Sequence, residues 1–158
     1  MFTKILLPLD RSQQADDVFA KAIKTALDND SQLMLFTALD WDFHVGLGAF
    51  DAIEMETDLS GAFANFQQSQ LEEKLSETRH WLKSYVAQAT EQHIPVQSRC
   101  AVGHPGPLIR DLAQEWGADL VVLGRRGLGG ITEMLLGSVS NYVLHHVACS
   151  VLVVQGNP

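Results

Sequence analysis

Short apolar segments alternate with longer amphipathic segments along the chain, which is the pattern of strands that alternate with helices. Most of the apolar segments lack a polar residue at every second position, so they read as strands buried on both faces. Such strands are typical of a parallel sheet that is covered by helices on both sides. The predicted strands are Lys4–Leu9, Gln32–Leu39, Val96–Val102, Leu120–Leu123 and Val151–Val154.

The segments between these strands carry apolar residues at helical spacing. Ser12 is suited to cap a first helix that starts at about Gln13, and Asn29-Asp30-Ser31 breaks it. We expect the buried stripe of this helix to consist of Val18, Phe19, Ala22, Ile23, Ala26 and Leu27. Three further helices are expected over Gln67–His93, Leu108–Trp116 and Ser138–His146.

One segment, Asp40–Phe66, shows neither the pattern of a strand nor that of a helix. It is too long for an ordinary connection, so we expect either a functional lid or a partly disordered segment, within which a weak helix could start. Trp41 and Phe43 are candidates for a mobile or interfacial patch. Trp81 and Trp116 fall on helical apolar stripes instead, and we expect them in the core.

The order of elements predicts a single domain, residues 1–158, with a five-stranded, doubly wound, Rossmann-like α/β fold. In such folds ligands bind outside the carboxyl ends of the strands, where the strand order reverses. The segments at these ends are Pro8-Leu9-Asp10, Ala38-Leu39-Asp40, Gly103-His104 and Gly124-Arg125-Arg126-Gly127.

The length of 158 residues and the apolar share of 46% suit one compact domain. No apolar run approaches the ~20 residues that span a bilayer. The N-terminal apolar run is closed by Pro8 and has no cleavage signal, so we expect a cytosolic location. Cys100 and Cys149 lie in or beside apolar runs and are expected to be reduced, buried thiols rather than zinc ligands.

The formal charge is 11 basic minus 19 acidic side chains, or −8. This balance argues against a nucleic-acid-binding protein, whose footprint is a basic patch. The acidic excess is local, because no Lys or Arg occurs between Thr25 and Glu73. Arg125 and Arg126, by contrast, stand together in a glycine-rich segment, which favours a small anionic ligand over a long polyanion.

That glycine-rich segment carries the clearest chemical signal in the chain. Gly124 and Gly127 are followed, after nine residues, by Gly137-Ser138 at the start of a predicted helix. Glycines let the backbone approach a ligand closely, and a helix start offers unpaired N–H groups, so the segment suits phosphate. The alternative is a loop that merely turns the chain. A P-loop is excluded because GxxxxGK(S/T) is absent, and Asp10 follows the first strand where a dinucleotide-binding fold would have GxGxxG.

Residues 117–154 closely resemble the universal stress protein family. The nucleotide-binding members carry G-x2-G-x9-G-(S/T), which Gly124, Gly127, Gly137 and Ser138 satisfy. The N-terminal run KILLPLDRS is similar to the family's first strand, and Gly103-x-Pro105-x-x-x-Ile109 is similar to its turn into the third helix. The resemblance covers the chain except for the acidic insertion at about 40–66, and it implies the adenine nucleotide hydrolase-like fold.

The resemblance implies that the protein binds ATP, with Mg²⁺ or Mn²⁺ held mainly through the phosphates and water. It places Pro8, Leu9 and Asp10 near the adenosine, with Asp10 toward the ribose, and the backbone of Ala38 at the adenine. It places Gly124 by the ribose. The implied phosphate-binding residues are Gly127, Gly137, Ser138, Val139 and Ser140, with hydroxyl donors from Ser138 and Ser140.

Several residues keep two interpretations. Arg125 and Arg126 depart from the family's usual residues, and either grip a phosphate or lie in solvent. Asp10 either contacts a ligand or caps the following helix. His104 could do acid–base chemistry, but no nucleophile accompanies it in the motif, so a turn residue is favoured. His145-His146 are expected to interact with a helix dipole rather than with a metal.

Three functions follow from these features. The favoured one is a nucleotide-binding regulatory protein of the stress response that passes its ATP-bound state to an unknown protein partner. A slow ATPase and a dimeric interaction module without nucleotide are the alternatives. Since Ser150–Val154 would form an exposed sheet edge and the family dimerises through this strand, we also expect a C2 homodimer. No catalytic residue, membrane contact or nucleic-acid contact is expected.

Overall fold

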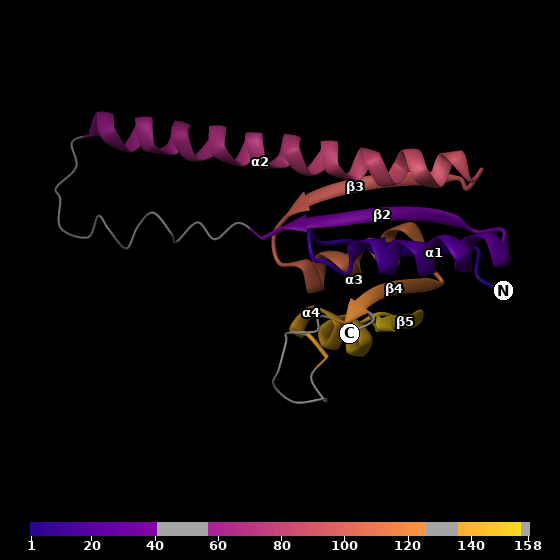
Figure 1. Ribbon diagram of the computed structural model, residues 1–158. Coiled ribbons are helices and arrows are strands. Elements are labelled where there is room, and N and C mark those ends of the chain that lie inside the picture. The colour runs from indigo at the N-terminus through magenta and orange to yellow at the C-terminus, as the bar shows by residue number, and fades with distance from the viewer. Residues whose placement is uncertain (41–56, 126–135, 156–158) are drawn as a thin grey trace.

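A computed structural model describes residues 1–40, 57–125 and 136–155 of the chain. Its strands form one parallel sheet in the order β3-β2-β1-β4-β5, which confirms the predicted fold (Figure 1). The elements are β1 (Lys4–Pro8), α1 (Ala15–Asn29), β2 (Gln32–Leu39), α2 (Thr57–Glu91), β3 (Val96–Val102), α3 (Pro105–Trp116), β4 (Leu120–Arg125), α4 (Ser138–His146) and β5 (Ser150–Gln155).

The strand order reverses at β1. Leu6 of this strand is paired with Met34 of β2 on one side and with Val121 of β4 on the other. The chain therefore builds β1, β2 and β3 outward in one direction and then returns to add β4 and β5 in the opposite direction. The carboxyl ends of β1 and β4 consequently border a crevice that no crossover connection fills, which is where such folds bind ligands.

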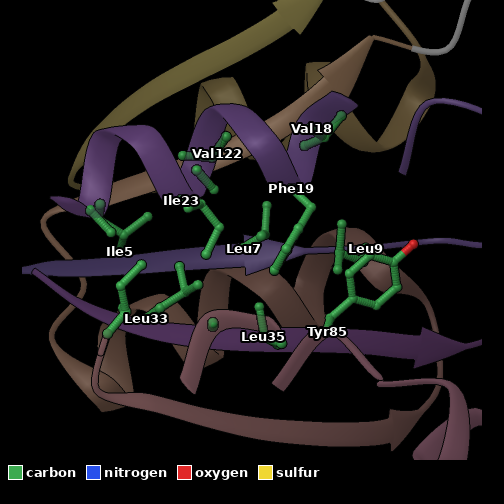
Figure 2. Packing of buried hydrophobic residues seen from close by; sticks show 14 of the residues in the cluster. Ile5, Leu7, Leu9, Val18, Phe19, Ile23, Leu33, Leu35, Tyr85 and Val122 are labelled. Atoms are coloured by element: carbon green, nitrogen blue, oxygen red, sulfur yellow. The ribbon is translucent and has the colours of Figure 1, made fainter. Parts of the chain in front are cut away.

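Two hydrophobic cores cover the two faces of the sheet. Ile5 and Leu7 face α1 and α2, whereas Leu6 faces α3 and α4, as expected for successive side chains of a strand. Figure 2 shows Leu7 and Leu9 of the first core packed close to Phe19 of α1 and Tyr85 of α2. Burial of each large side chain contributes about 1.5–3 kcal/mol, so the cores fix the helices against the sheet.

The N-terminal ends of α1 and α3 differ from their predicted positions. α1 starts at Ala15 rather than at about Gln13, because the chain turns through Gln14 before the helix begins. Leu27 was predicted in the buried stripe of α1 but is 52% exposed, because it lies to one side of that stripe. α3 starts at Pro105 rather than at Leu108, since proline is suited to the first helical positions.

Helix α2 differs most from the sequence prediction. It begins at Thr57, so a helix does start within the Asp40–Phe66 segment, as the sequence allowed, whereas the predicted start of the long helix at Gln67 was wrong. Residues 41–56, with Trp41 and Phe43, lie outside the described residues. Helix α2 has 35 residues, which correspond to a length of roughly 50 Å. The strands are much shorter, so the first half of α2 projects past the sheet (Figure 1).

The remaining core expectations are met in part. Trp81 and Trp116 pack against the two cores but keep some exposure. Cys100 and Cys149 are free thiols that are half-buried rather than buried, and burial raises the pKa of each. No helix in the described part of the chain has both the length and the apolar character needed to cross a bilayer. The cytosolic location stays a prediction.

Candidate functional site

A cavity of about 300 Å³ lies at the reversal of the strand order. Its volume is within the range of small-molecule sites. The segment after β1, the ends of β2 and β4, and the first turns of α1, α3 and α4 enclose it. The lining residues are Pro8, Leu9, Asp10, Ser12, Gln14, Ala15, Val18, Phe36, Ala38, Asp40, Pro105, Ile109, Leu123, Gly124, Gly137, Ser138, Val139 and Ser140.

The start of α4 forms one end of the cavity. Gly137 is the N-cap, and its carbonyl oxygen accepts the N–H of Asn141 at 2.9 Å. The N–H groups of Ser138, Val139 and Ser140 precede that first helical bond, and N–H groups in this position have no acceptor within the helix. Together with the helix dipole they favour an anion at this end of the cavity.

Gly124 ties β4 to both neighbouring helices. Its carbonyl oxygen accepts a hydrogen bond of 3.0 Å from the hydroxyl of Ser140, whose side chain is buried. A Cβ atom at Gly124 would lie 2.9 Å from Cγ2 of Val18, so glycine allows α1 to pack closely here. Since the hydroxyl proton of Ser140 is already donated to Gly124, this residue can offer a ligand its N–H group rather than its hydroxyl proton.

Asp10 shapes the segment between β1 and α1. Its Oδ1 accepts the N–H of Ser12 at 3.1 Å, and the Ser12 carbonyl accepts the N–H of Ala15 at 3.2 Å. The segment is anchored to β2, because Leu9 donates its N–H to the Phe36 carbonyl at 2.8 Å. Asp10 thus stabilises the turn before α1, and this residue also lines the cavity.

Part of the cavity lining is apolar. Leu9, Phe36, Ala38 and Ile109 belong to this part, and Phe36 is almost fully buried. Such a lining suits a flat hydrophobic ring, so one cavity combines apolar side chains with the N–H groups at the start of α4.

Asp40, which lines the cavity, forms an ion pair with His104. Nδ1 of His104 lies 3.4 Å from Oδ1 of Asp40, and both side chains are more than half exposed. A pair this exposed contributes little to stability. His104 is the N-cap of α3 and is not a cavity-lining residue, in agreement with its interpretation as a turn residue.

In the last turn of α4, His146 donates a hydrogen bond from Nδ1 to the Tyr142 carbonyl at 2.7 Å, near the negative end of the helix dipole.

The cavity brings together most of the residues that the sequence singled out. Nine of them line it: Pro8, Leu9, Asp10, Ala38, Gly124, Gly137, Ser138, Val139 and Ser140. Arg125 is the last residue of β4 and is not among the lining residues, while Arg126 and Gly127 lie outside the described residues.

Sequence reasoning missed the apolar and packing contributions to the cavity. Phe36 lies two residues before Ala38 in a strand, and Gln14 lies four before Val18 at the start of a helix, so each pair shares a face. These spacings could have pointed to Phe36 and to the first turn of α1. Ile109 closes the stretch Gly103-x-Pro105-x-x-x-Ile109 that resembles the family's turn, but the sequence did not place its side chain in the cavity.

The donor set in the cavity suits an anion bound by the main chain. The lining carries Asp10 and Asp40 but, in the part of the chain that the structure describes, neither lysine nor arginine. The described residues also contain no group of three His, Cys, Asp or Glu side chains placed to hold a metal ion. A phosphate ligand would therefore meet N–H groups and a helix dipole, and a cation would depend on the phosphate oxygens and water.

Comparison with known proteins points to one family. The model of the Universal stress protein family matches residues 1–155. The chain is 45% identical, over 154 residues and 98% of each chain, to the universal stress protein Sll1388 of Synechocystis sp..

Solved structures agree in fold. The hypothetical protein MJ0577 matches with a TM-score of 0.75 and 24% identity, covering 100% of this chain and 99% of its own. A universal stress protein in complex with cAMP matches with a TM-score of 0.61 and 21% identity, covering 97% and 96%. A family member from Arabidopsis thaliana with AMP bound matches with a TM-score of 0.62 and 17% identity, covering 98% and 92%.

Proposed function

Since the chain belongs to the universal stress protein family, we propose that it is an ATP-binding regulatory protein whose nucleotide occupies the cavity between β1, β2, β4 and α4. The observation that carries this proposal is that one cavity is lined both by the start of α4 and by apolar side chains. The N–H groups at the start of α4 suit the phosphates, and the apolar wall around Phe36 suits the adenine ring.

In this proposal the predicted site residues contact different parts of the nucleotide. Ser138, Val139 and Ser140 bind phosphate oxygens through their N–H groups. Asp10 lies toward the ribose, and the backbone of Ala38 contacts adenine at the end of β2. The placement of these two follows the family resemblance. Bound ATP would bring Mg²⁺ or Mn²⁺, which neutralises phosphate charge and keeps water ligands. Gly127 belongs to the proposed phosphate site by its place in the motif, whereas Arg125 and Arg126 stand at variable positions and either grip a phosphate or lie in solvent.

The bound ligands of two family structures support an adenine nucleotide. One was solved with AMP and another with cAMP. ATP is the proposed ligand here because Gly124, Gly137 and Ser138 keep the spacing of the nucleotide-binding motif. A ligand with more phosphate groups also makes fuller use of the N–H groups at the start of α4.

The regulatory form is proposed to be a homodimer. β5 is an edge strand, and edge strands present unpaired backbone groups that another strand can satisfy. Leu152 on β5 is 38% exposed, so this edge carries apolar surface. A C2 axis that pairs two copies of β5 would bury it.

A thermal-shift experiment tests the nucleotide site. Gly137 has a φ of −56°, which any residue adopts, so Gly137→Val acts by placing a side chain in the cavity rather than by straining the backbone. Gly61→Val is the matched control, because no atom lies within 4 Å of the Cβ position at Gly61 in α2. Millimolar Mg-ATP is expected to raise the Tm of the wild type and of Gly61→Val, but not that of Gly137→Val. An equal rise in the Tm of all three proteins would contradict the binding of ATP in this cavity.

A further inference from the structure

The segment that walls the cavity on the α1 side also contacts helix α2. Asp10, Ser12, Gln14 and Ala15 line the cavity. Their neighbours Arg11 and Asp16 contact α2 instead. The same short stretch of chain therefore borders the ligand site and the long helix.

Two contacts join this segment to α2. The guanidinium carbon of Arg11 lies 5.8 Å from the ring centroid of Trp81, at cation–π distance. The hydroxyl of Tyr85 donates a hydrogen bond of 2.7 Å to Oδ1 of Asp16, in the first turn of α1. Because Trp81 and Tyr85 are one helical turn apart, both contacts act on the same part of α2.

Tyr85 is held rigidly between the two helices. Its ring packs edge-on against Phe19 of α1, with centroids 4.8 Å apart, and against Trp81, with centroids 5.2 Å apart. Only 6% of Tyr85 is exposed, and Figure 2 shows it beside Leu9, which itself lines the cavity. A shift of the first turn of α1 therefore has to move Tyr85 or break a buried contact.

We propose that Trp81 and Tyr85 are positioning residues for the cavity wall at Asp10–Ala15, so that nucleotide binding and the docking of α2 on the sheet are thermodynamically coupled. This inference rests on the proposed function, since it assumes a nucleotide in the cavity. Coupling between two sites is reciprocal. A ligand that orders the wall strengthens the docking of α2, and weaker docking of α2 lowers the affinity for the ligand.

Because α2 is long, this coupling would also act on the part of the helix that projects past the sheet. Thr78 is the first residue of the described helix that is buried, and the helix before it leaves the core. Phe66 is 61% exposed on that projecting part, and it lies 15 residues, or roughly 22 Å, from Trp81. A small rotation at Trp81 and Tyr85 therefore displaces Phe66 by more than it displaces the cavity wall.

The test uses variants that keep the packing. Tyr85→Phe removes the hydroxyl but leaves the ring, and Arg11→Met removes the charge but leaves the stem. Arg11→Lys keeps the cation. Ser84→Ala alters the exposed side of the same turn of α2, where the Ser84 hydroxyl donates a hydrogen bond to the Trp81 carbonyl. The combined variant Arg11→Met/Tyr85→Phe is expected to bind Mg-ATP at least fivefold more weakly by calorimetry. Arg11→Lys and Ser84→Ala are expected to bind within twofold of the wild type.

Amide hydrogen exchange supplies a second readout, in which β3 reports the overall stabilisation that any bound ligand gives. Saturating Mg-ATP is expected to slow exchange in residues 79–91 of α2 at least threefold more than in β3 in the wild type, but not in the combined variant. Unchanged affinity in the combined variant, or unchanged exchange in wild-type α2, would overturn the coupling while ATP binding stands. Absence of Mg-ATP binding by the wild type would overturn the proposed function, and the coupling with it.

Discussion

The hydroxyl of Ser140 donates a hydrogen bond to the carbonyl oxygen of Gly124, with 3.0 Å between the two oxygens. The bond joins the first turn of α4 to the end of β4, two elements that the glycine motif connects in sequence. It thereby holds the N–H groups of α4 in line with the cavity.

Replacing Ser140 by Ala removes this bond and leaves the Gly124 carbonyl without the hydroxyl. Loss of one partner of a buried hydrogen bond costs about 1–3 kcal/mol, so the free energy of unfolding should fall by that amount. Urea denaturation measures it. Ser138→Ala is the control, because Ser138 is exposed and its substitution should change stability by less than about 0.5 kcal/mol. Equal free energies of unfolding for the two variants would show that the hydrogen bond of Ser140 does not stabilise the fold.

Gly124→Ala should destabilise the protein by about 1–3 kcal/mol, because the new Cβ would lie 2.9 Å from Cγ2 of Val18, a stiff β-branched side chain. Adding Val18→Ala removes the clash, so the two substitutions together should cost less than the sum of their separate effects. Chemical denaturation of the four proteins in this cycle gives the comparison. Strictly additive losses would mean that Gly124 is not required for this close approach.

The stability of the protein should fall in acid through Asp119. Burial acts to raise the pKa of this carboxyl, but hydrogen bonds from Thr3 and Lys4 outweigh burial and hold the pKa below its ordinary value of 3.8. The stabilisation is therefore fully present above pH 3.8 and is lost as the pH falls through the lower pKa of the folded state.

Asp119→Asn provides the measurement. This variant should lose roughly 1 kcal/mol at neutral pH, a modest amount because the hydrogen bonds are partly exposed. Its urea midpoint should also fall less steeply than that of the wild type between about pH 5 and pH 2. An identical slope in both proteins would contradict the role given to Asp119.

Leu152→Asp should convert the proposed dimer into monomers, because it places a charge on the exposed face of the β5 edge. Sedimentation velocity of wild type and variant at equal concentration measures the change. Leu27→Asp is the control, since Leu27 on α1 is also an exposed leucine, at 52% against 38% for Leu152. A wild-type protein that sediments as a monomer would contradict the dimer itself.

The sequence predicted local features of this fold better than packing between distant elements. β2, β3 and α4 begin and end where their patterns predict, because each is bounded by residues that stop it. The sequence allowed a weak helix within Asp40–Phe66 but did not locate the start of α2 at Thr57, because the helix before Thr78 leaves the core and shows no apolar stripe in its sequence.

The same distinction applies to the candidate site. Gly124 and Gly137 could be found because the motif places them at a fixed spacing in one stretch of chain. Val18 and Ile109 reach the cavity only through the docking of α1 and α3 on opposite faces of the sheet. Spacing along the chain does not specify which turn of a docked helix lies over the cavity, so these residues required the structure.

Calorimetric titration of nucleotide-free protein with Mg-ATP, and with AMP for comparison, tests the central claim most directly. The account predicts micromolar binding of ATP at one site per chain and weaker binding of AMP, because the additional phosphates of ATP meet the N–H groups of Ser138, Val139 and Ser140. The absence of heat and of any shift in Tm at millimolar ATP would contradict it. Gly124 and Gly137 would then only shape a loop.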